Sequence, residues 1–151
     1  MTIIGVLLPE LEKASEGSEF KIMSYKFEYK AWDPKNKFYN KIKELLEDED
    51  ISVKLLGGMP NKELYRSSLK SLFELGAEIR ILEEPPTAHV FIHNSLNGKK
   101  FIWFEAEHKN EQAICVSYTK YPSQNDLGFA NNYFDVEWKK AMPFDKFKTS
   151  L

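Results

Sequence analysis

The amino-acid sequence predicts a single α/β domain built on a mixed sheet. Its first half alternates short apolar segments of strand length with longer segments of helical periodicity, and its second half holds three strand-like segments followed by a helix. The 151 residues contain no internal repeat and no Gly/Ser linker, so residues 1–151 are expected to form one unit. The predicted order is therefore β-α-β-α-β, a three-strand meander and a C-terminal helix.

The composition excludes several classes of protein. With 42% hydrophobic and 14% aromatic residues, the chain has enough apolar surface for a packed core and is not a disordered tail. A net charge of −2 gives no overall attraction to nucleic acid or to an anionic membrane. We find no uncharged apolar run near ~18 residues and no basic leader, and therefore expect a cytoplasmic protein without a membrane span. The single cysteine, Cys115, excludes an internal disulfide.

The first two segments are a helix-like stretch and a strand. Leu7 and Leu11 fit one face of a helix, although Pro9 then has to occupy a first turn or a kink. Residues 20–29 predict a strand in which the large side chains at positions 23, 25, 27 and 29 share one face. Aromatic side chains in such a row can stack on single-stranded nucleic acid, but they are more typical of a core face.

Two helices and two strands follow. Asp33 as N-cap and Pro34 as the first helical residue predict a helix that ends near the acidic run at residues 47–50. A strand is expected over residues 51–56, a second helix over about residues 60–75, and a further strand over residues 77–82. Because Gly57-Gly58 lies between a strand and a helix, it is a candidate anion-binding turn, although a plain connection is the simpler interpretation.

The second half predicts a meander and a closing helix. Strands are expected over residues 88–94, 100–107 and 113–119, and the dipeptide Asn97-Gly98 is a strong hairpin signal between the first two. The last helix is expected over residues 129–142, with an apolar stripe formed by Phe134, Trp138, Ala141 and Met142.

Histidine and glutamate side chains are the candidates for chemistry in this meander. The even spacing of His89 and His93 places both on one face of the first strand, and Glu105 and Glu107 share a face of the second. The hairpin therefore predicts a His/Glu cluster that is able to bind a divalent metal or to transfer a proton. The alternative interpretation is that the histidines are partly buried and hydrogen-bonded while the acids face water.

The element order and several local segments resemble a single phospholipase D-like domain of the HKD superfamily. The resemblance spans roughly residues 20–144. It rests on the strands at residues 20–25 and 51–56, the helix start at 33–34, the Leu-Gly-x-Glu-x-Arg strand entry at 75–80, and the Phe134 to Trp138 spacing in the last helix.

The chemistry of that superfamily lies in a His-x-Lys-x-x-x-x-Asp motif, in which the histidine attacks a phosphodiester and the lysine holds the phosphate. In the register that ends at the hairpin turn, Thr87 takes the histidine position, His89 the lysine position and Asn94 the aspartate position. A register shifted by two keeps His89 as histidine but places Phe91 and Leu96 at the other two positions. At least two of the three essential residues are missing either way, so we expect no catalysis.

The resemblance therefore implies a non-catalytic phospholipase D-like domain that binds a small polar or phosphorylated ligand, or a protein partner. The expected binding residues are Thr87, His89, Asn94, Glu105 and Glu107. The resemblance implies a homodimer, and neither a cofactor nor a metal is expected. Two enzymatic alternatives stay open: a residual phosphodiesterase or nuclease with His89 as nucleophile, and a metal-assisted hydrolase with His93 and nearby glutamates.

Overall fold

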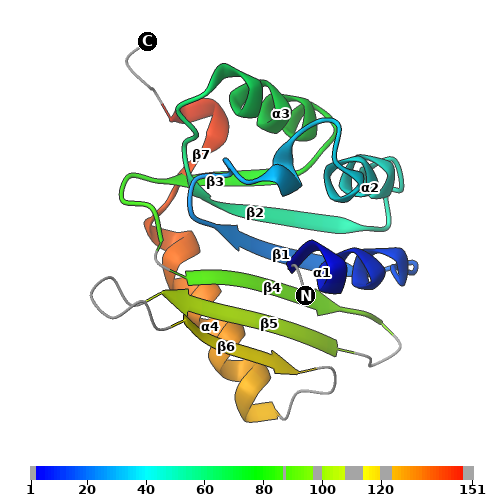
Figure 1. The fold of residues 1–151 in the computed structure, drawn as a ribbon. Helices are drawn as coiled ribbons and strands as arrows, with labels where there is room; N and C mark the ends of the chain where they lie inside the picture. The colour runs from blue at the N-terminus through cyan, green and yellow to red at the C-terminus, as the bar shows by residue number, and fades with distance from the viewer. Residues whose placement is uncertain (1–2, 87, 97–99, 108–113, 120–123, 148–151) are drawn as a thin grey trace.

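In the described ranges of the chain, seven strands lie side by side in one mixed sheet, with helices on both faces (Figure 1). The computed structural model describes residues 3–86, 88–96, 100–107, 114–119 and 124–147, and leaves the side chains of residues 3–4 and 104–126 outside the description. The strand order is β6-β5-β4-β1-β2-β3-β7, so β1 lies in the middle of the sheet.

The first half of the chain forms the parallel part of the sheet. The strands are β1 (Glu19–Ser24), β2 (Ser52–Gly58) and β3 (Glu78–Leu82), and they alternate with α2 (Lys37–Leu46) and α3 (Glu63–Glu74). β1 pairs in parallel with β2, and β2 pairs in parallel with β3. The predicted β-α-β-α-β order is confirmed.

The second half forms the antiparallel part. The strands are β4 (Ala88–Asn94), β5 (Lys100–Glu107) and β6 (Ile114–Thr119), and α4 (Gln124–Lys140) follows them. β4 runs antiparallel to β5, and β5 runs antiparallel to β6, as the meander predicts. β4 also runs antiparallel to β1, which joins the two halves of the sheet. At the other edge, the unpredicted two-residue strand β7 (Met142–Pro143) pairs with β3.

The alternation of side chains along the strands separates two hydrophobic clusters, one on each face of the sheet. On one face, Phe20 and Phe91 pack under α1 (Ile3–Glu12), α2 and α3. On the other face, Val90 and Ile92 pack under Phe134 of α4. β4 thus contributes neighbouring residues to opposite clusters, as a strand covered on both faces must.

Helix α1 resolves the ambiguous start of the chain. Leu7 and Leu11 are buried against the sheet, as the helical spacing indicates. Pro9 lies inside this helix rather than in its first turn.

Helix α4 starts five residues earlier than the sequence predicts and ends at Lys140. Phe134 is fully buried, Trp138 and Ala141 are partly buried, and Met142 is exposed because it has left the helix to pair with Ile81. The predicted helical stripe is therefore correct only as far as Trp138, because Ala141 follows the last residue of the helix. Across the described ranges, no helix is long and apolar enough to cross a membrane.

The start of α2 differs from the prediction. Asp33 accepts a hydrogen bond from the Lys35 backbone N–H at 2.8 Å in the turn before the helix, and Asn36 is the N-cap, accepting from the Phe38 N–H at 2.8 Å. Asp33-Pro34 therefore forms a turn that leads into the helix rather than the helix start.

We expect Asn36→Ala to lower the free energy of unfolding by about 1 kcal/mol, because the first turn of α2 loses the acceptor for an N–H group. Urea denaturation measures this change. Asp33→Ala serves as the comparison, and a larger loss for Asp33→Ala than for Asn36→Ala would contradict the assignment of the cap.

Candidate functional site

The predicted histidine and glutamate candidates lie on the β4–β5 hairpin. The ladder pairs His89 with Glu105, and His93 with Phe101. The structure therefore brings the backbones of His89 and Glu105 together, as the hairpin signal predicts. Thr87 and the side chains of Glu105 and Glu107 lie outside the described part of the chain.

His89 is half-buried at the start of β4 and contacts Tyr29, which lies in the segment after β1. The Tyr29 hydroxyl and His89 Nε2 are 3.1 Å apart, within hydrogen-bond distance. The two rings meet edge to face, with centroids 5.1 Å apart. Tyr29 is 46% exposed, so this pair lies at the surface, at the carboxyl end of β1. Ligands of α/β sheets commonly bind at the carboxyl ends of parallel strands.

A sharp turn after β1 carries Tyr29 to this position. β1 ends at Ser24, and the prediction of a strand through Tyr29 is wrong. The turn contains Phe27, whose φ of 54° lies in the left-handed region that a bulky residue rarely adopts. Its ring is fully buried and packs edge to face on Trp32, with centroids 5.0 Å apart. Burial of this ring offsets the cost of the backbone conformation.

Ser24, the last residue of β1, adds a hydroxyl group to the same end of the sheet. The β1–β4 ladder pairs Met23 with Val90, so Ser24 is at the next position, toward His89. Ser24 is 3% exposed, and its Oγ has no hydrogen-bond partner within the described residues. A buried hydroxyl that lacks a hydrogen-bond partner lowers stability, so the Ser24 hydroxyl is a candidate ligand-binding group. Nothing in the sequence pattern singles out Ser24 as a binding residue.

Asn94 lies at the opposite end of β4 from His89. Five residue-to-residue steps of extended strand separate the two by roughly 17 Å. The Asn94 side-chain amide donates to Glu19 Oε1 at 3.3 Å, and its own Oδ1 is buried without a partner in the described ranges. The structure therefore does not bring Asn94 together with His89 in one cleft.

His93 belongs to a buried polar network that holds α1 on the sheet. Its Nδ1 is 3.3 Å from Glu10 Oε1, its Nε2 is 3.0 Å from Ser18 Oγ, and its ring stacks on Phe20 with centroids 4.2 Å apart. Glu10 comes from α1, not from the glutamates of β5. The order Ser–His–carboxylate is that of a hydrolase triad, but Ser18 is only 1% exposed and accepts from the Ser15 N–H. We interpret the network as structural.

The network predicts a pH-dependent stability. Burial lowers the pKa of His93, and this effect outweighs the opposite effect of Glu10. The unfolded chain therefore binds the proton more readily, so the contribution of neutral His93 is complete above about pH 6.5 and is lost as the pH falls below that value. Urea denaturation at a series of pH values is expected to show this loss for the wild type and a flatter profile for His93→Gln. Equal slopes in both proteins would contradict the assignment.

A metal site is not assembled by the described residues. No group of three or more His, Cys, Asp or Glu side chains gathers within the part of the chain whose side chains are described. The predicted cluster of His93 with Glu105 and Glu107 falls partly outside that part, and the carboxylate that His93 does contact is that of Glu10.

The pair Gly57-Gly58 is explained by packing. A Cβ at Gly57 would overlap the Ser24 backbone oxygen and the Phe27 ring, and one at Gly58 would lie 2.8 Å from both Pro85 and the Tyr25 backbone oxygen. The Gly58 N–H donates to that Tyr25 oxygen at 2.8 Å. Both glycines therefore allow the turn after β1 to lie close against β2, and the space that an anion would need is filled.

Comparison with known proteins adds no assignment to this geometry. No protein-family model matches the chain, and a search of curated proteins finds no significant match.

Proposed function

We propose that this chain is a non-catalytic phospholipase D-like domain that binds a small polar or phosphorylated ligand at the end of the sheet where Tyr29 and His89 meet. The observation that carries the proposal is the Tyr29–His89 contact, with Nε2 and the hydroxyl 3.1 Å apart. In the register that ends at the hairpin turn, His89 takes the position of the phosphate-holding lysine of the superfamily.

The arrangement of the elements supports the family part of the proposal. The resemblance rests on a β-α-β-α-β unit, a meander and a closing helix, and the observed elements follow that order. Two residues on which the resemblance rests also contact each other. Arg80, from the Leu-Gly-x-Glu-x-Arg segment, lies over the ring of Trp138 in the closing helix, 4.5 Å from its centroid.

The groups at this end of the sheet suit a ligand that offers both hydrogen-bond donors and acceptors. Ser24 and Tyr29 bring hydroxyl groups, which donate and accept, and His89 brings an imidazole. Glu105, the register partner of His89, adds a formal negative charge to the hairpin. A simple anion therefore meets less favourable electrostatics than a phosphorylated polyol, whose hydroxyl groups can donate to a carboxylate.

Loss of the motif argues against phosphodiester cleavage. Threonine in place of the nucleophilic histidine has no activating base in the pattern, and no lysine is left to stabilise the charge of the phosphorane. Thr87 itself lies outside the described residues.

Hydrolysis assays test the absence of catalysis. A chromogenic phosphodiester and single-stranded DNA are incubated with the wild type and His89→Ala, with and without EDTA. We expect no turnover above the blank. EDTA-resistant turnover that disappears in His89→Ala would contradict the proposal and make His89 the nucleophile, and turnover that disappears only with EDTA would favour the metal-assisted alternative.

The homodimer implied by the resemblance is part of the same proposal. Light scattering coupled to gel filtration measures the mass in solution, and we expect about twice the 17.6 kDa of the chain. A mass of one chain at all concentrations would remove the dimer from the proposal without affecting the ligand site.

A further inference from the structure

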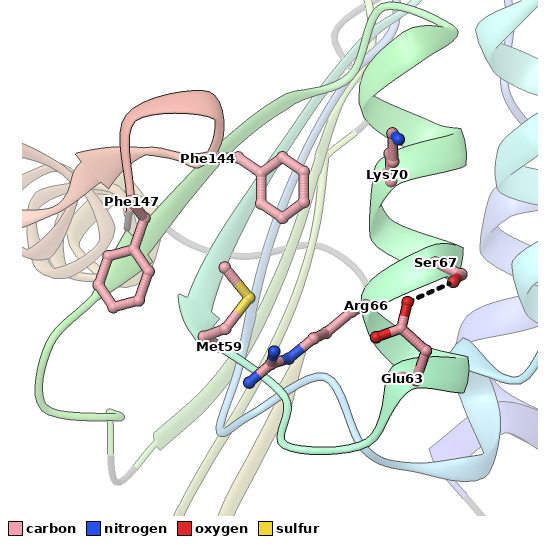
Figure 2. A pocket seen from close by; sticks show the side chains of 7 residues that line it. All are labelled: Met59, Glu63, Arg66, Ser67, Lys70, Phe144 and Phe147. Carbon is pink, nitrogen blue, oxygen red and sulfur yellow. Dashed lines mark hydrogen bonds between the residues drawn. The ribbon is translucent and has the colours of Figure 1, made fainter. Parts of the chain in front are cut away.

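A pocket of about 210 Å³ lies beyond the carboxyl end of β2, between α3 and the C-terminal segment (Figure 2). Met59, directly after β2, lies at the centre of the view, and α3 contributes the polar side of the pocket. Phe144 and Phe147 come from the short helix η2 (Phe144–Lys146) and the residue after it. The pocket shares no residue with the Tyr29–His89 site.

Two cations on α3 define the polar side. Arg66 and Lys70 are four residues apart and therefore lie on one face of the helix. The Arg66 Nε donates to the Pro60 backbone oxygen at 2.7 Å, which fixes the guanidinium while its outer nitrogens remain able to donate. Neither cation forms an ion pair with any residue that the structure describes. Arg66 is one of only two arginines in the chain.

Glu63, the one acid that lines the pocket, is hydrogen-bonded to a residue of its own helix. Glu63 Oε1 accepts a hydrogen bond from the Ser67 hydroxyl at 3.3 Å, drawn as a dashed line in Figure 2. Lining charges are therefore two positive and one negative, which favours an anion over a cation.

The opposite side is apolar and is held in place by the sheet. β7 pairs with β3, and the Phe147 N–H donates to the Pro143 backbone oxygen at 3.0 Å. Phe144 packs on Phe73 of α3, with ring centroids 5.5 Å apart. The pocket is smaller than the roughly 300–1,000 Å³ that drug-sized ligands occupy, so it suits a molecule with a single ring or a short aliphatic chain.

We propose that this pocket binds a small organic anion with an aromatic or aliphatic body. Arg66 holds its carboxylate or phosphate group, since a guanidinium presents paired donors to such planar or tetrahedral oxyanions. Lys70 lies apart from the Arg66 guanidinium in Figure 2 and adds positive charge to the pocket. The body of the ligand lies against Met59, Phe144 and Phe147. Neither half of the pocket suffices alone: Arg66 orients the head group, and removal of the body from water provides the hydrophobic contribution.

A titration followed by two-dimensional ¹H–¹⁵N NMR tests this proposal. Phenylacetate and phenyl phosphate are the probes, acetate and inorganic phosphate lack the body, and benzyl alcohol lacks the charge. We expect saturable shifts at the amides of α3 and of residues 144–147 for both probes at millimolar concentrations, and much smaller shifts with the three control compounds.

Three charge variants distinguish the contribution of the charges in the pocket from a general effect of the substitutions on the protein. Arg66→Gln is expected to weaken phenylacetate binding about tenfold, the effect of one charge-assisted hydrogen bond. Lys62→Gln removes the same charge just before α3 but outside the pocket, and is expected to leave the affinity within about twofold, as for an exposed charge. Glu63→Gln is expected to strengthen binding because it removes the negative charge from the pocket.

Three results would overturn the proposal. The first is the absence of shifts at the pocket with either probe, and the second is equal binding of benzyl alcohol, which would make the pocket merely apolar. The third is equal binding of inorganic phosphate, which would reduce it to a cationic patch. Shifts confined to Tyr29 and His89 belong to the other site and count as absence of binding here, so the two proposals fail independently.

Discussion

Replacement of Phe134 by alanine is expected to lower the free energy of unfolding by about 3–5 kcal/mol, the largest effect of any single change considered. Phe134 is fully buried where α4 meets the sheet, among Met23, Val90, Ile92 and Ile102. Its ring also stacks on Trp138, with centroids 5.6 Å apart. Chemical denaturation followed by circular dichroism measures the loss.

Phe129 provides a matched control on the same helix. It is 62% exposed, so Phe129→Ala is expected to change the free energy of unfolding by about 0.5 kcal/mol or less. Similar losses of stability for the two variants would contradict the packing of α4 on the sheet. They would also remove the Phe134 to Trp138 spacing as support for the family resemblance.

Replacement of Gly57 by alanine is expected to cost about 2–3 kcal/mol although it adds a single methyl group. The new Cβ would overlap the Ser24 backbone oxygen and the buried Phe27 ring, and a backbone atom of the central strand cannot move aside at low cost. The variant is also expected to broaden the NMR signals of Tyr29, because the turn that carries this residue must shift.

Gly128 is a control for the Gly57 variant, because the same substitution there is expected to raise the free energy of unfolding. It lies inside α4, and among the described residues a Cβ there meets no atom within 4 Å beyond its chain neighbours and the nearby backbone of its own helix. Gly128→Ala is therefore expected to stabilise the protein by about 0.5–1 kcal/mol, since alanine favours a helix over glycine. If Gly57→Ala also stabilised the protein, the close approach of the turn to β2 would be wrong.

Much of the fold was predictable because it follows from local periodicity. The bounds of β4 and β5 agree with those expected, since an Asn-Gly turn flanked by apolar segments restricts the register of a hairpin. The strand expected through Tyr29 fails for a non-local reason. The alternation of aromatics continues past Ser24, but the chain turns where Gly57 of the neighbouring strand admits it.

The site was predictable only in part. The hairpin register places His89 beside Glu105, as the Asn97-Gly98 signal indicates. Tyr29, which contacts His89, is 60 positions away in sequence, and Glu10, which contacts His93, is 83 away. No periodic pattern in a single sequence links such distant positions. The pocket depends on a similarly distant contact, because Phe144 packs on Phe73 of α3.

Titration with glycerol 3-phosphate, followed by the aromatic NMR signals of histidine and tyrosine, tests whether Tyr29 and His89 form a ligand site. His93 is an internal reference, because it lies on the same strand but is buried against Glu10 and Ser18. We expect saturable shifts of the His89 and Tyr29 signals, an unchanged His93 signal, and at least about tenfold weaker binding in His89→Ala. An unchanged His89 signal, or equal affinity in His89→Ala, would contradict it.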